Sequence, residues 1–88
     1  MDDLCYTYMI RCADGSLYTG WTTDLPGRII MHNQGKGAKY TRSRLPVELV
    51  FARGFPSRSQ AMSFEYELKS YRRSTKLHLA QNWLAKSN

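Results

Sequence analysis

The stretch 17–35, LYTGWTTDLPGRIIMHNQG, constrains the fold more than any other part of the chain, because strand and helix signals follow each other closely. We expect a strand to end in a sharp turn at Gly20, with a short helix after it. Asp24 is placed to cap this helix, and Pro26 falls in its first turn, where the missing N–H costs nothing. The stretch therefore predicts a strand that leads directly into a helix.

Three side chains with distinct chemistry come from this stretch: the phenol of Tyr18, the guanidinium of Arg28 and the imidazole of His32. Residues four apart share one face of a helix, so Arg28 and His32 should project together. Asn33 and Gly35 fit the end of the helix, with Gly35 suited to a left-handed residue. The strand thus delivers one candidate functional group, and the helix delivers two more.

The 88 residues suffice for one domain with a modest core. Hydrophobic residues make up 42% and aromatic residues 12%, which is typical of a globular chain. The apolar runs are far too short to span a membrane, and the acidic start MDDLCY is unlike a signal peptide. Cys5 and Cys12 fall on one expected strand, too far apart for a disulfide, so we interpret both as reduced. We therefore expect a single cytoplasmic domain over residues 1–88 with no membrane partner.

The formal net charge is +6, and its distribution is informative. Residues 25–47 contain no Asp or Glu but several Lys and Arg, so this segment should attract a polyanion, most simply nucleic-acid phosphate. Its glycines, hydroxyls and tyrosine would add backbone N–H donors and a stacking ring. The alternative is a basic loop that is merely solvated. The candidate nucleic-acid-binding residues are Lys36, Lys39, Tyr40, Thr41, Arg42 and Arg44.

Residues 6–12 alternate between two faces in the manner of a strand, and Asp14-Gly15 is a hairpin signal. The length of the hairpin loop matters for function. A two-residue loop would place Tyr8 and Tyr18 on opposite faces of the sheet. A three-residue loop with Gly15 left-handed would place both phenols on one face. The sequence is compatible with both loops.

A third strand is predicted over residues 47–51, with Val47, Leu49 and Phe51 on one face. A helix separates this strand from the hairpin, so it could join either edge. The expected order of elements along the chain is strand, strand, helix, strand, helix, helix.

Capping signals precede both of the last two helices. Ser57 and Gln60 form a capping box, and Ser74 can cap a helix over residues 75–86. Glu65 falls at the margin of the apolar stripe of the first of these helices, where core meets solvent. The apolar sides consist of Ala61, Phe64, Leu68 and Tyr71 in the first helix, and of Leu77, Ala80, Trp83 and Leu84 in the second.

Two tripeptides, Tyr6-Thr7-Tyr8 and Tyr18-Thr19-Gly20, resemble the pair that names the GIY-YIG nuclease superfamily. Arg28 lies ten residues after the Tyr of the second tripeptide, where that family has its helix arginine. Glu65, within FEYELK, stands where the family keeps its metal-binding glutamate. The stretches GKGAKYTRSRLPVELV and FPSRSQA resemble the small, one-domain bacterial branch, and the likeness covers nearly the whole chain.

This resemblance implies an α+β fold, a three-stranded antiparallel sheet flanked by helices. It also implies hydrolysis of phosphodiester bonds in DNA with Mg²⁺ or Mn²⁺, branched or damaged DNA being one candidate substrate. Two residues depart from the family's pattern, and the second of them concerns activation of the attacking water. Tyr6 stands where the name-giving pattern has Gly, and Trp21 stands where excinuclease relatives place a Lys near that water.

The residue types fit this chemistry in their own right. Glu65 could hold one metal ion, which would keep most of its waters and bind well only with substrate. Arg28 would clamp the scissile phosphate as a bidentate donor. Because a free phenol titrates near pH ~10, a tyrosine base needs a cation beside it. Tyr18 is the candidate base, His32 could take the proton instead or relay it, and Tyr8 would orient the water or Tyr18.

Each assignment has a plainer alternative. The two tyrosines could be ordinary sheet residues, and His32 could simply meet the helix dipole. Glu65 could pair with Lys69 or Arg72 on its own helix. Three functions follow from these alternatives: a nuclease acting on DNA or RNA, a nucleic-acid-binding module with little activity alone, and a protein-interaction module. A homodimer or a protein partner could supply substrate selectivity.

Overall fold

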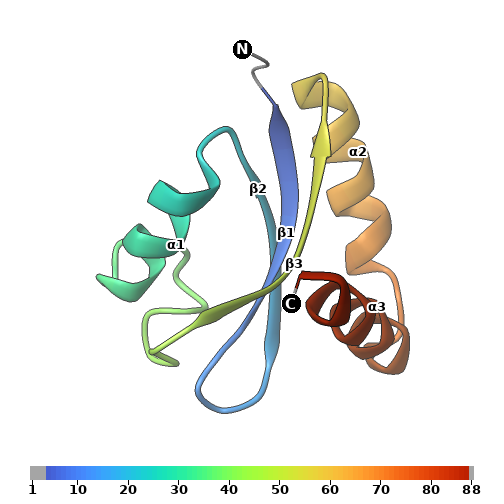
Figure 1. Ribbon diagram of the computed structural model, residues 1–88. Helices are drawn as coiled ribbons and strands as arrows, with labels where there is room; N and C mark the ends of the chain where they lie inside the picture. The colour runs from blue at the N-terminus through green and yellow to red at the C-terminus, as the bar shows by residue number, and fades with distance from the viewer. Residues whose placement is uncertain (1–3, 88) are drawn as a thin grey trace.

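The computed structural model describes residues 4–87 and shows one sheet between two layers of helix (Figure 1). The strands are β1 (Cys5–Arg11), β2 (Leu17–Thr22) and β3 (Glu48–Phe55), antiparallel in the order β2-β1-β3. The helices are α1 (Leu25–Asn33), α2 (Arg58–Lys69) and α3 (Arg73–Ser87). The predicted α+β class and element order are confirmed. The acidic residues at the start of the chain lie outside the described part. No helix within it is long and apolar enough to cross a membrane.

Each face of the sheet carries its own hydrophobic cluster, one under α1 and the other under α2 and α3 (Figure 1). The alternation of side chains along β1 supplies both clusters. Cys5 and Cys12 are buried free thiols, as the sequence predicts. The α1 face is built on Tyr8, Ile10, Cys12 and Val47, and the other face on Met9, Val50, Phe51, Leu68 and Ala80.

The hairpin between β1 and β2 has the three-residue loop, residues 13–15. Tyr8 pairs with Gly20, so Tyr18, two residues earlier on β2, lies on the same face as Tyr8. Gly15 has a φ of +86°, in the left-handed region that glycine adopts readily. The structure therefore selects the loop that brings both phenols to the α1 face.

The predicted sharp turn at Gly20 is wrong, because β2 continues through this residue to Thr22. A Cβ atom at position 20 would lie 2.7 Å from the hydroxyl oxygen of Tyr8 and 2.9 Å from its Cζ. Glycine is needed here because the Tyr8 ring crosses directly over the strand.

β3 pairs with β1 and makes β1 the central strand. Met9 pairs with Phe51, but Ile10 pairs with Leu49, so Val50 is an extra residue and the register shifts. This irregularity turns Phe51 to the α2 side, while Leu49 packs on the α1 side. The prediction that Leu49 and Phe51 share a face is therefore wrong, since alternation fails across an inserted residue.

The first two helices begin as the sequence predicts. The Asp24 carboxylate accepts a hydrogen bond from the Gly27 N–H at 3.2 Å and caps α1. The Ser57 hydroxyl accepts from the Gln60 N–H at 3.2 Å and caps α2. Gly35, just beyond α1, has a φ of +76°, as expected for a residue that ends a helix.

The last helix begins earlier than predicted, at Arg73, so Ser74 is inside the helix rather than at its cap. The Arg72 carbonyl already accepts a helical hydrogen bond from the Lys76 N–H at 3.0 Å, and this sets the start. Leu84 is 40% exposed, and the contacts with the core come from Leu79, Ala80 and Trp83 instead.

Candidate active site at the edge of strand β2

A buried chain of hydrogen bonds runs from α1 through β1 to the loop that follows α1. The Arg28 Nε–H donates to the Tyr8 hydroxyl oxygen at 3.4 Å, and that oxygen lies 2.8 Å from His32 Nε2. His32 Nδ1 lies 3.0 Å from Thr41 Oγ1, which donates to the Ala38 carbonyl at 3.0 Å. Tyr8, His32 and Thr41 are fully buried, so the two hydrogen bonds of His32 are shielded from water, whereas the bonds at the two ends of the chain are part-buried.

The donors of this chain determine the tautomer of His32. The Thr41 hydroxyl has one proton, which goes to the Ala38 carbonyl, so it accepts from the Nδ1–H of His32. Nε2 is then the acceptor, and the Tyr8 hydroxyl donates to it. The Tyr8 oxygen in turn accepts from Arg28. The chain therefore requires a neutral imidazole and a neutral phenol.

The electrostatics agree with these neutral forms. Burial lowers the pKa of His32, and the positive charge of Arg28 lowers it further. Burial raises the pKa of Tyr8, against the opposing effects of the Arg28 hydrogen bond and charge. The negative charges of Tyr18 and Glu65 raise the Tyr8 pKa further.

The lowered pKa of His32 predicts a loss of stability in mild acid. Below pH ~6.5 the unfolded chain takes up a proton on His32 that the folded chain refuses, so the free energy of unfolding falls with pH. We expect the melting temperature to fall between about pH 6.5 and the lowered folded pKa. The His32→Gln variant should lose this part of the pH dependence, whereas His78→Gln, at an exposed histidine, should retain it. Nitrogen-detected NMR of the wild-type imidazole should show a proton on Nδ1; a proton on Nε2 alone would contradict the assignment.

Tyr18 lies beside this chain and contacts it through its ring. The Tyr18 and His32 ring centroids are 5.5 Å apart in an edge-on arrangement. On the other side the Tyr18 ring stacks with Tyr40 at 6.2 Å and an interplanar angle of 21°. No hydrogen bond joins the Tyr18 phenol to another residue of the described chain. Since Tyr18 is only half-buried, its phenol is the one of the two that solvent reaches.

Glu65 approaches from the other face of the sheet, because α2 packs opposite α1 (Figure 1). Its side chain is 19% exposed, and its carboxylate forms an ion pair with Lys69 at 3.4 Å. The same carboxylate is near enough to Tyr8 to influence the pKa of the phenol. Lys69 also lines a hollow of about 340 Å³ together with Tyr18 and Tyr40. Groups from the two faces thus come together at the free edge of β2.

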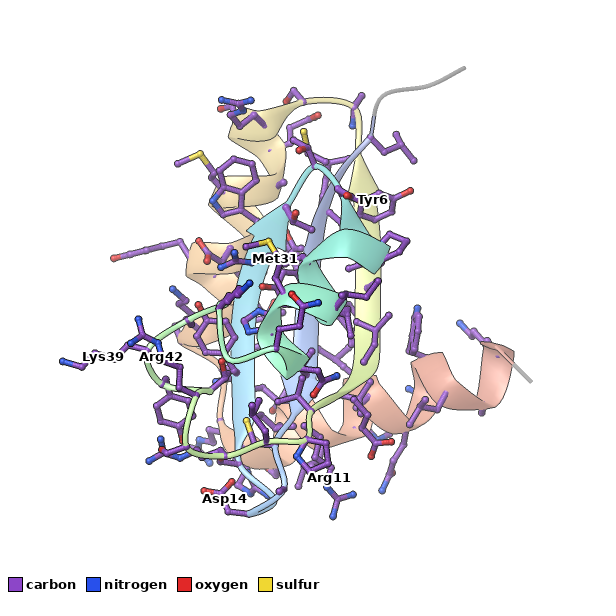
Figure 2. All side chains as sticks on the ribbon, turned by 90° about the vertical axis from the view of Figure 1, so that its left-hand side faces the viewer. Tyr6, Arg11, Asp14, Met31, Lys39 and Arg42 are labelled. Atoms are coloured by element: carbon purple, nitrogen blue, oxygen red, sulfur yellow. The ribbon has the colours of Figure 1, made fainter. Side chains whose placement is uncertain are left out.

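The basic loop, residues 34–47, divides into exposed cations and structural residues. Lys36, Lys39 and Arg42 are exposed and form no ion pair within residues 4–87. Figure 2 shows Lys39 and Arg42 projecting outward from the loop. Thr41 is fully buried and uses its hydroxyl within the hydrogen-bonded chain. The prediction that Thr41 contacts nucleic acid is therefore wrong.

Arg44 holds the loop against the hairpin. Its Nε–H donates to the Asp14 carboxylate at 3.1 Å, and its Nη1 donates to the Tyr40 carbonyl at 2.6 Å. The guanidinium also lies 3.9 Å from the centre of the Tyr40 ring. These contacts indicate a bracing role for Arg44, which sequence reasoning had grouped with the phosphate-binding cations.

Two residues that organise the site were missed from the sequence. A Cβ atom at position 37 would lie 2.3 Å from His32 Nδ1, so Gly37 lets the loop close over the imidazole. Asn33 bonds to both backbone groups of Val47, at 2.7 and 3.0 Å, and ties the end of α1 to the start of β3. The closely spaced Gly35 and Gly37 were a signal of close backbone approach, whereas Asn33 resembled an ordinary helix end.

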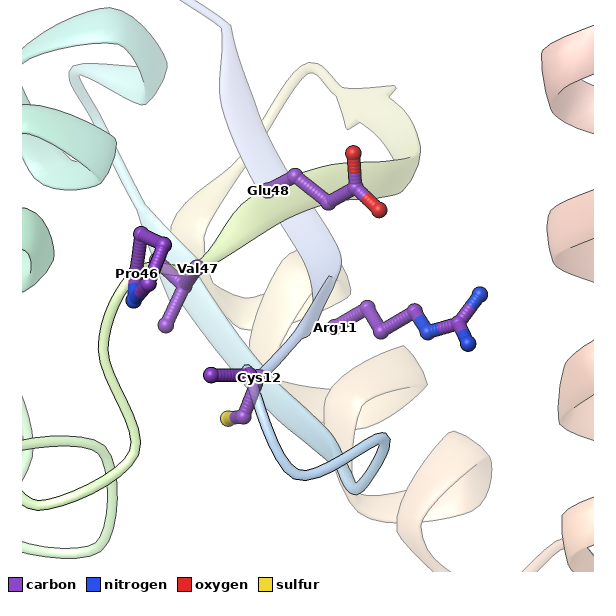
Figure 3. A pocket seen from close by; sticks show the side chains of 6 residues that line it. Arg11, Cys12, Pro46, Val47 and Glu48 are labelled. Carbon is purple, nitrogen blue, oxygen red and sulfur yellow. The ribbon is translucent and has the colours of Figure 1, made fainter.

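A larger hollow, about 560 Å³, lies between the end of β1 and the segment that leads into β3 (Figure 3). Its lining includes Arg11, Cys12, Val47 and Glu48. None of the candidate catalytic residues contributes to it, and Arg11 and Glu48 are exposed. We therefore place the candidate active site at the β2 edge.

The donor set at the β2 edge fits a metal ion that binds together with substrate. Within residues 4–87 no three His, Cys, Asp or Glu side chains are grouped so as to hold a metal ion. Mg²⁺ commonly uses one or two carboxylates together with substrate phosphates and retains waters. A single carboxylate, that of Glu65, is sufficient for that mode of binding.

Comparison with known proteins agrees with the fold and the motifs. A family model described as the GIY-YIG catalytic domain matches residues 4–78. A UPF0213 protein of Haloquadratum walsbyi is 53% identical over 81 residues, covering 92% of this chain and 91% of the relative. A UPF0213 protein of Streptococcus pneumoniae is 54% identical over 76 residues, covering 86% and 77%.

Two solved structures also match. The solution NMR structure of the UPF0213 protein from Bacillus halodurans has a TM-score of 0.57 and 50% identity, covering 89% of this chain and 83% of that one. A solution NMR structure of a protein from E. faecalis has a TM-score of 0.61 and 35% identity, covering 97% and 93%.

Proposed function

The chain belongs to the GIY-YIG family, and from this membership and the geometry of the β2 edge we propose that it is a single-domain endonuclease that uses Mg²⁺ or Mn²⁺ to hydrolyse phosphodiester bonds in DNA. The observation that carries the proposal is the buried chain from Thr41 through His32 and Tyr8 to Arg28. An ordinary surface arginine is not held by a chain of buried side chains. A guanidinium that must clamp a phosphate in one orientation needs to be held in this way, because catalysis depends on positioning.

Arg28 is the proposed phosphate clamp. Its Nε–H is held by the Tyr8 oxygen, which leaves the Nη groups for two oxygens of the scissile phosphate. No acid occurs between residues 25 and 47 to neutralise the guanidinium locally. Tyr8 acts as a positioning residue, since it is fully buried and reaches the substrate only through Arg28.

Tyr18 is the proposed general base, and the His32 ring packs against the Tyr18 ring. Both ring nitrogens of His32 are engaged, and the residue is fully buried, so it is not arranged to take a proton directly from water. The half-buried Tyr18 phenol, whose ring contacts the His32 ring in an edge-on arrangement, is better placed to do so. His32 therefore serves to orient the two tyrosines.

Glu65 is the proposed metal ligand. A divalent ion held there would neutralise charge that develops on the phosphoryl oxygens. Lys69, paired with Glu65 in this structure, must release the carboxylate for that purpose. The exposed cations Lys36, Lys39 and Arg42 would hold the strand next to the site through its phosphates.

The function is tested by incubating the purified protein with single-stranded, double-stranded and branched DNA in the presence of Mg²⁺ or Mn²⁺. Arg28→Lys keeps the charge but loses both the fork and the Nε–H bond to Tyr8. We expect its cleavage rate to fall by about 10²-fold, comparable to the loss of one transition-state donor. Arg53→Lys is the matched control, because Arg53 packs on Phe55 and Phe64 away from the site.

The outcomes separate the alternatives. Salt-sensitive binding without cleavage by the wild type would favour a nucleic-acid-binding module over an enzyme. Equal cleavage by wild type and Arg28→Lys would show that the activity comes from elsewhere. Cleavage of RNA instead of DNA would keep the site and change the substrate.

A further inference from the structure

The hollow at the edge of β2 has a composition that suits an anion. Two tyrosines line it, together with one lysine from α2 and one from α3. The residues that line it are Leu17, Tyr18, Thr19, Tyr40, Lys69 and Lys76. Three secondary-structure elements and the basic loop therefore contribute to one small volume of about 340 Å³.

Thr19 gives an independent sign that a ligand belongs there. The residue is only 5% exposed, and its hydroxyl lacks a hydrogen-bond partner. Within residues 4–87, Thr19 Oγ1 is the one buried side-chain nitrogen or oxygen atom without a hydrogen-bond partner. An unpaired buried hydroxyl lowers stability, so valine, of nearly the same shape, would fold better at this position. We therefore interpret the Thr19 hydroxyl as a group whose partner arrives with the ligand.

The charges in the hollow favour a phosphate over a neutral ligand. Lys76 is half-buried and forms no ion pair within the described chain, so its ammonium group is available. Lys69 pairs with Glu65, which leaves this lysine free for another anion once a metal ion takes the carboxylate. A phosphate would then receive two positive charges and a hydroxyl donor.

The hollow is linked to the candidate active site through two of its lining residues. Tyr18 belongs to both, since its ring contacts His32 and also lines the hollow. Lys69 joins them a second time through its ion pair with Glu65. A strand whose scissile phosphate lay on Arg28 would therefore reach the hollow as it follows the edge of β2.

We propose that this hollow binds a second phosphate of the nucleic-acid strand, next to the scissile one, through Lys69, Lys76 and the hydroxyl of Thr19. The proposal rests on the proposed endonuclease function. A rotation of the Thr19 side chain to another staggered rotamer would turn its hydroxyl toward a phosphate oxygen when the strand enters. The subsite would hold the strand in register while Arg28 and Glu65 act on the neighbouring linkage.

The Thr19→Val variant distinguishes a ligand-binding hydroxyl from a structural one. We expect its melting temperature to be equal to or above that of the wild type, because an unpaired buried hydroxyl has been removed. Its affinity for an oligonucleotide, measured without metal so that no cleavage occurs, should fall by about tenfold. A variant that melts higher and binds as tightly as the wild type would overturn the role of Thr19.

The Lys76→Gln variant tests the phosphate contact itself. Binding should become less salt-dependent, with the slope of log affinity against log salt reduced by ~0.7–0.9, as for the loss of one phosphate contact. Lys86→Gln removes the same charge from an exposed position near the end of α3 and should leave the slope unchanged. Equal slopes for the two variants would overturn the subsite.

A neutral linkage in the DNA locates the contact. After the cleavage position on an oligonucleotide is mapped, methylphosphonates are placed one linkage to either side. One of these should weaken binding by the wild type, and Lys76→Gln should show no further loss with that oligonucleotide. If neither methylphosphonate weakens binding although the wild type cleaves DNA, the subsite is overturned and the endonuclease function is kept. Absence of wild-type cleavage would overturn the endonuclease function and the subsite together.

Discussion

Glu65→Gln is expected to reduce Mg²⁺-dependent DNA cleavage by about 10²–10³-fold, the scale seen when one transition-state stabilising group is removed. Glu65 supplies the carboxylate of the site, and an amide oxygen holds Mg²⁺ far less well than a carboxylate does. The loss should appear in the rate and not in metal-free binding of the strand. Removing a negative charge beside Lys69 makes phosphate binding equal or tighter.

Glu67→Gln is the matched control. It changes the same functional group on the same helix, but the Glu67 carboxylate accepts a hydrogen bond from the Tyr71 hydroxyl in an exposed position. Its cleavage rate should match that of the wild type. If Glu65→Gln cleaves as fast as Glu67→Gln across a titration of Mg²⁺, the assignment of the metal ligand is wrong.

Gly20→Ala is expected to destabilise the fold by about 1–3 kcal/mol, the usual effect of overpacking a filled interior, and to lower activity as well. The added methyl group would lie 2.7 Å from the Tyr8 oxygen and 2.9 Å from its Cζ. Tyr8 is fully buried and tied to His32 and Arg28, so it cannot move aside without breaking those bonds. Urea or thermal denaturation measures the first effect and the cleavage assay the second.

Gly54→Ala provides the comparison, because Gly54 of β3 pairs with Tyr6 of β1 as Gly20 of β2 pairs with Tyr8. A Cβ there would meet Leu4 Cδ1 at 3.1 Å and Tyr6 Cε1 at 3.3 Å, contacts that partly exposed side chains relieve. We expect a change within ~0.5 kcal/mol.

A double variant identifies the clashing atom. Tyr8→Phe removes the oxygen nearest to the new methyl group, so the two substitutions should be less than additive in stability. Strict additivity would mean that the destabilisation of Gly20→Ala does not act through Tyr8.

The local features of this protein could be derived from its sequence. The caps at Asp24 and Ser57 and the left-handed Gly35 depend on neighbours a few residues away, so spacing alone predicts them. The order of the elements, the free cysteines and the exposed cations of the basic loop follow in the same way. The four-residue spacing of Arg28 and His32 also predicted that both side chains lie on one face of the helix, as part of the candidate site.

Tertiary structure decided the remainder. The loop length that unites Tyr8 with Tyr18, the pairing of β3 with β1 and the inserted Val50 all depend on contacts between distant segments. Gly20 and Thr41 show this most directly. Gly20 was predicted to form a turn, but it makes room for the Tyr8 phenol. Thr41 was predicted to be at the surface, but it hydrogen-bonds to the buried His32 imidazole. Local sequence specifies hydrogen bonds and turns within a few residues. Which side chain fills which space depends on the packing of the whole chain, because every buried polar group must find a partner wherever the fold provides one.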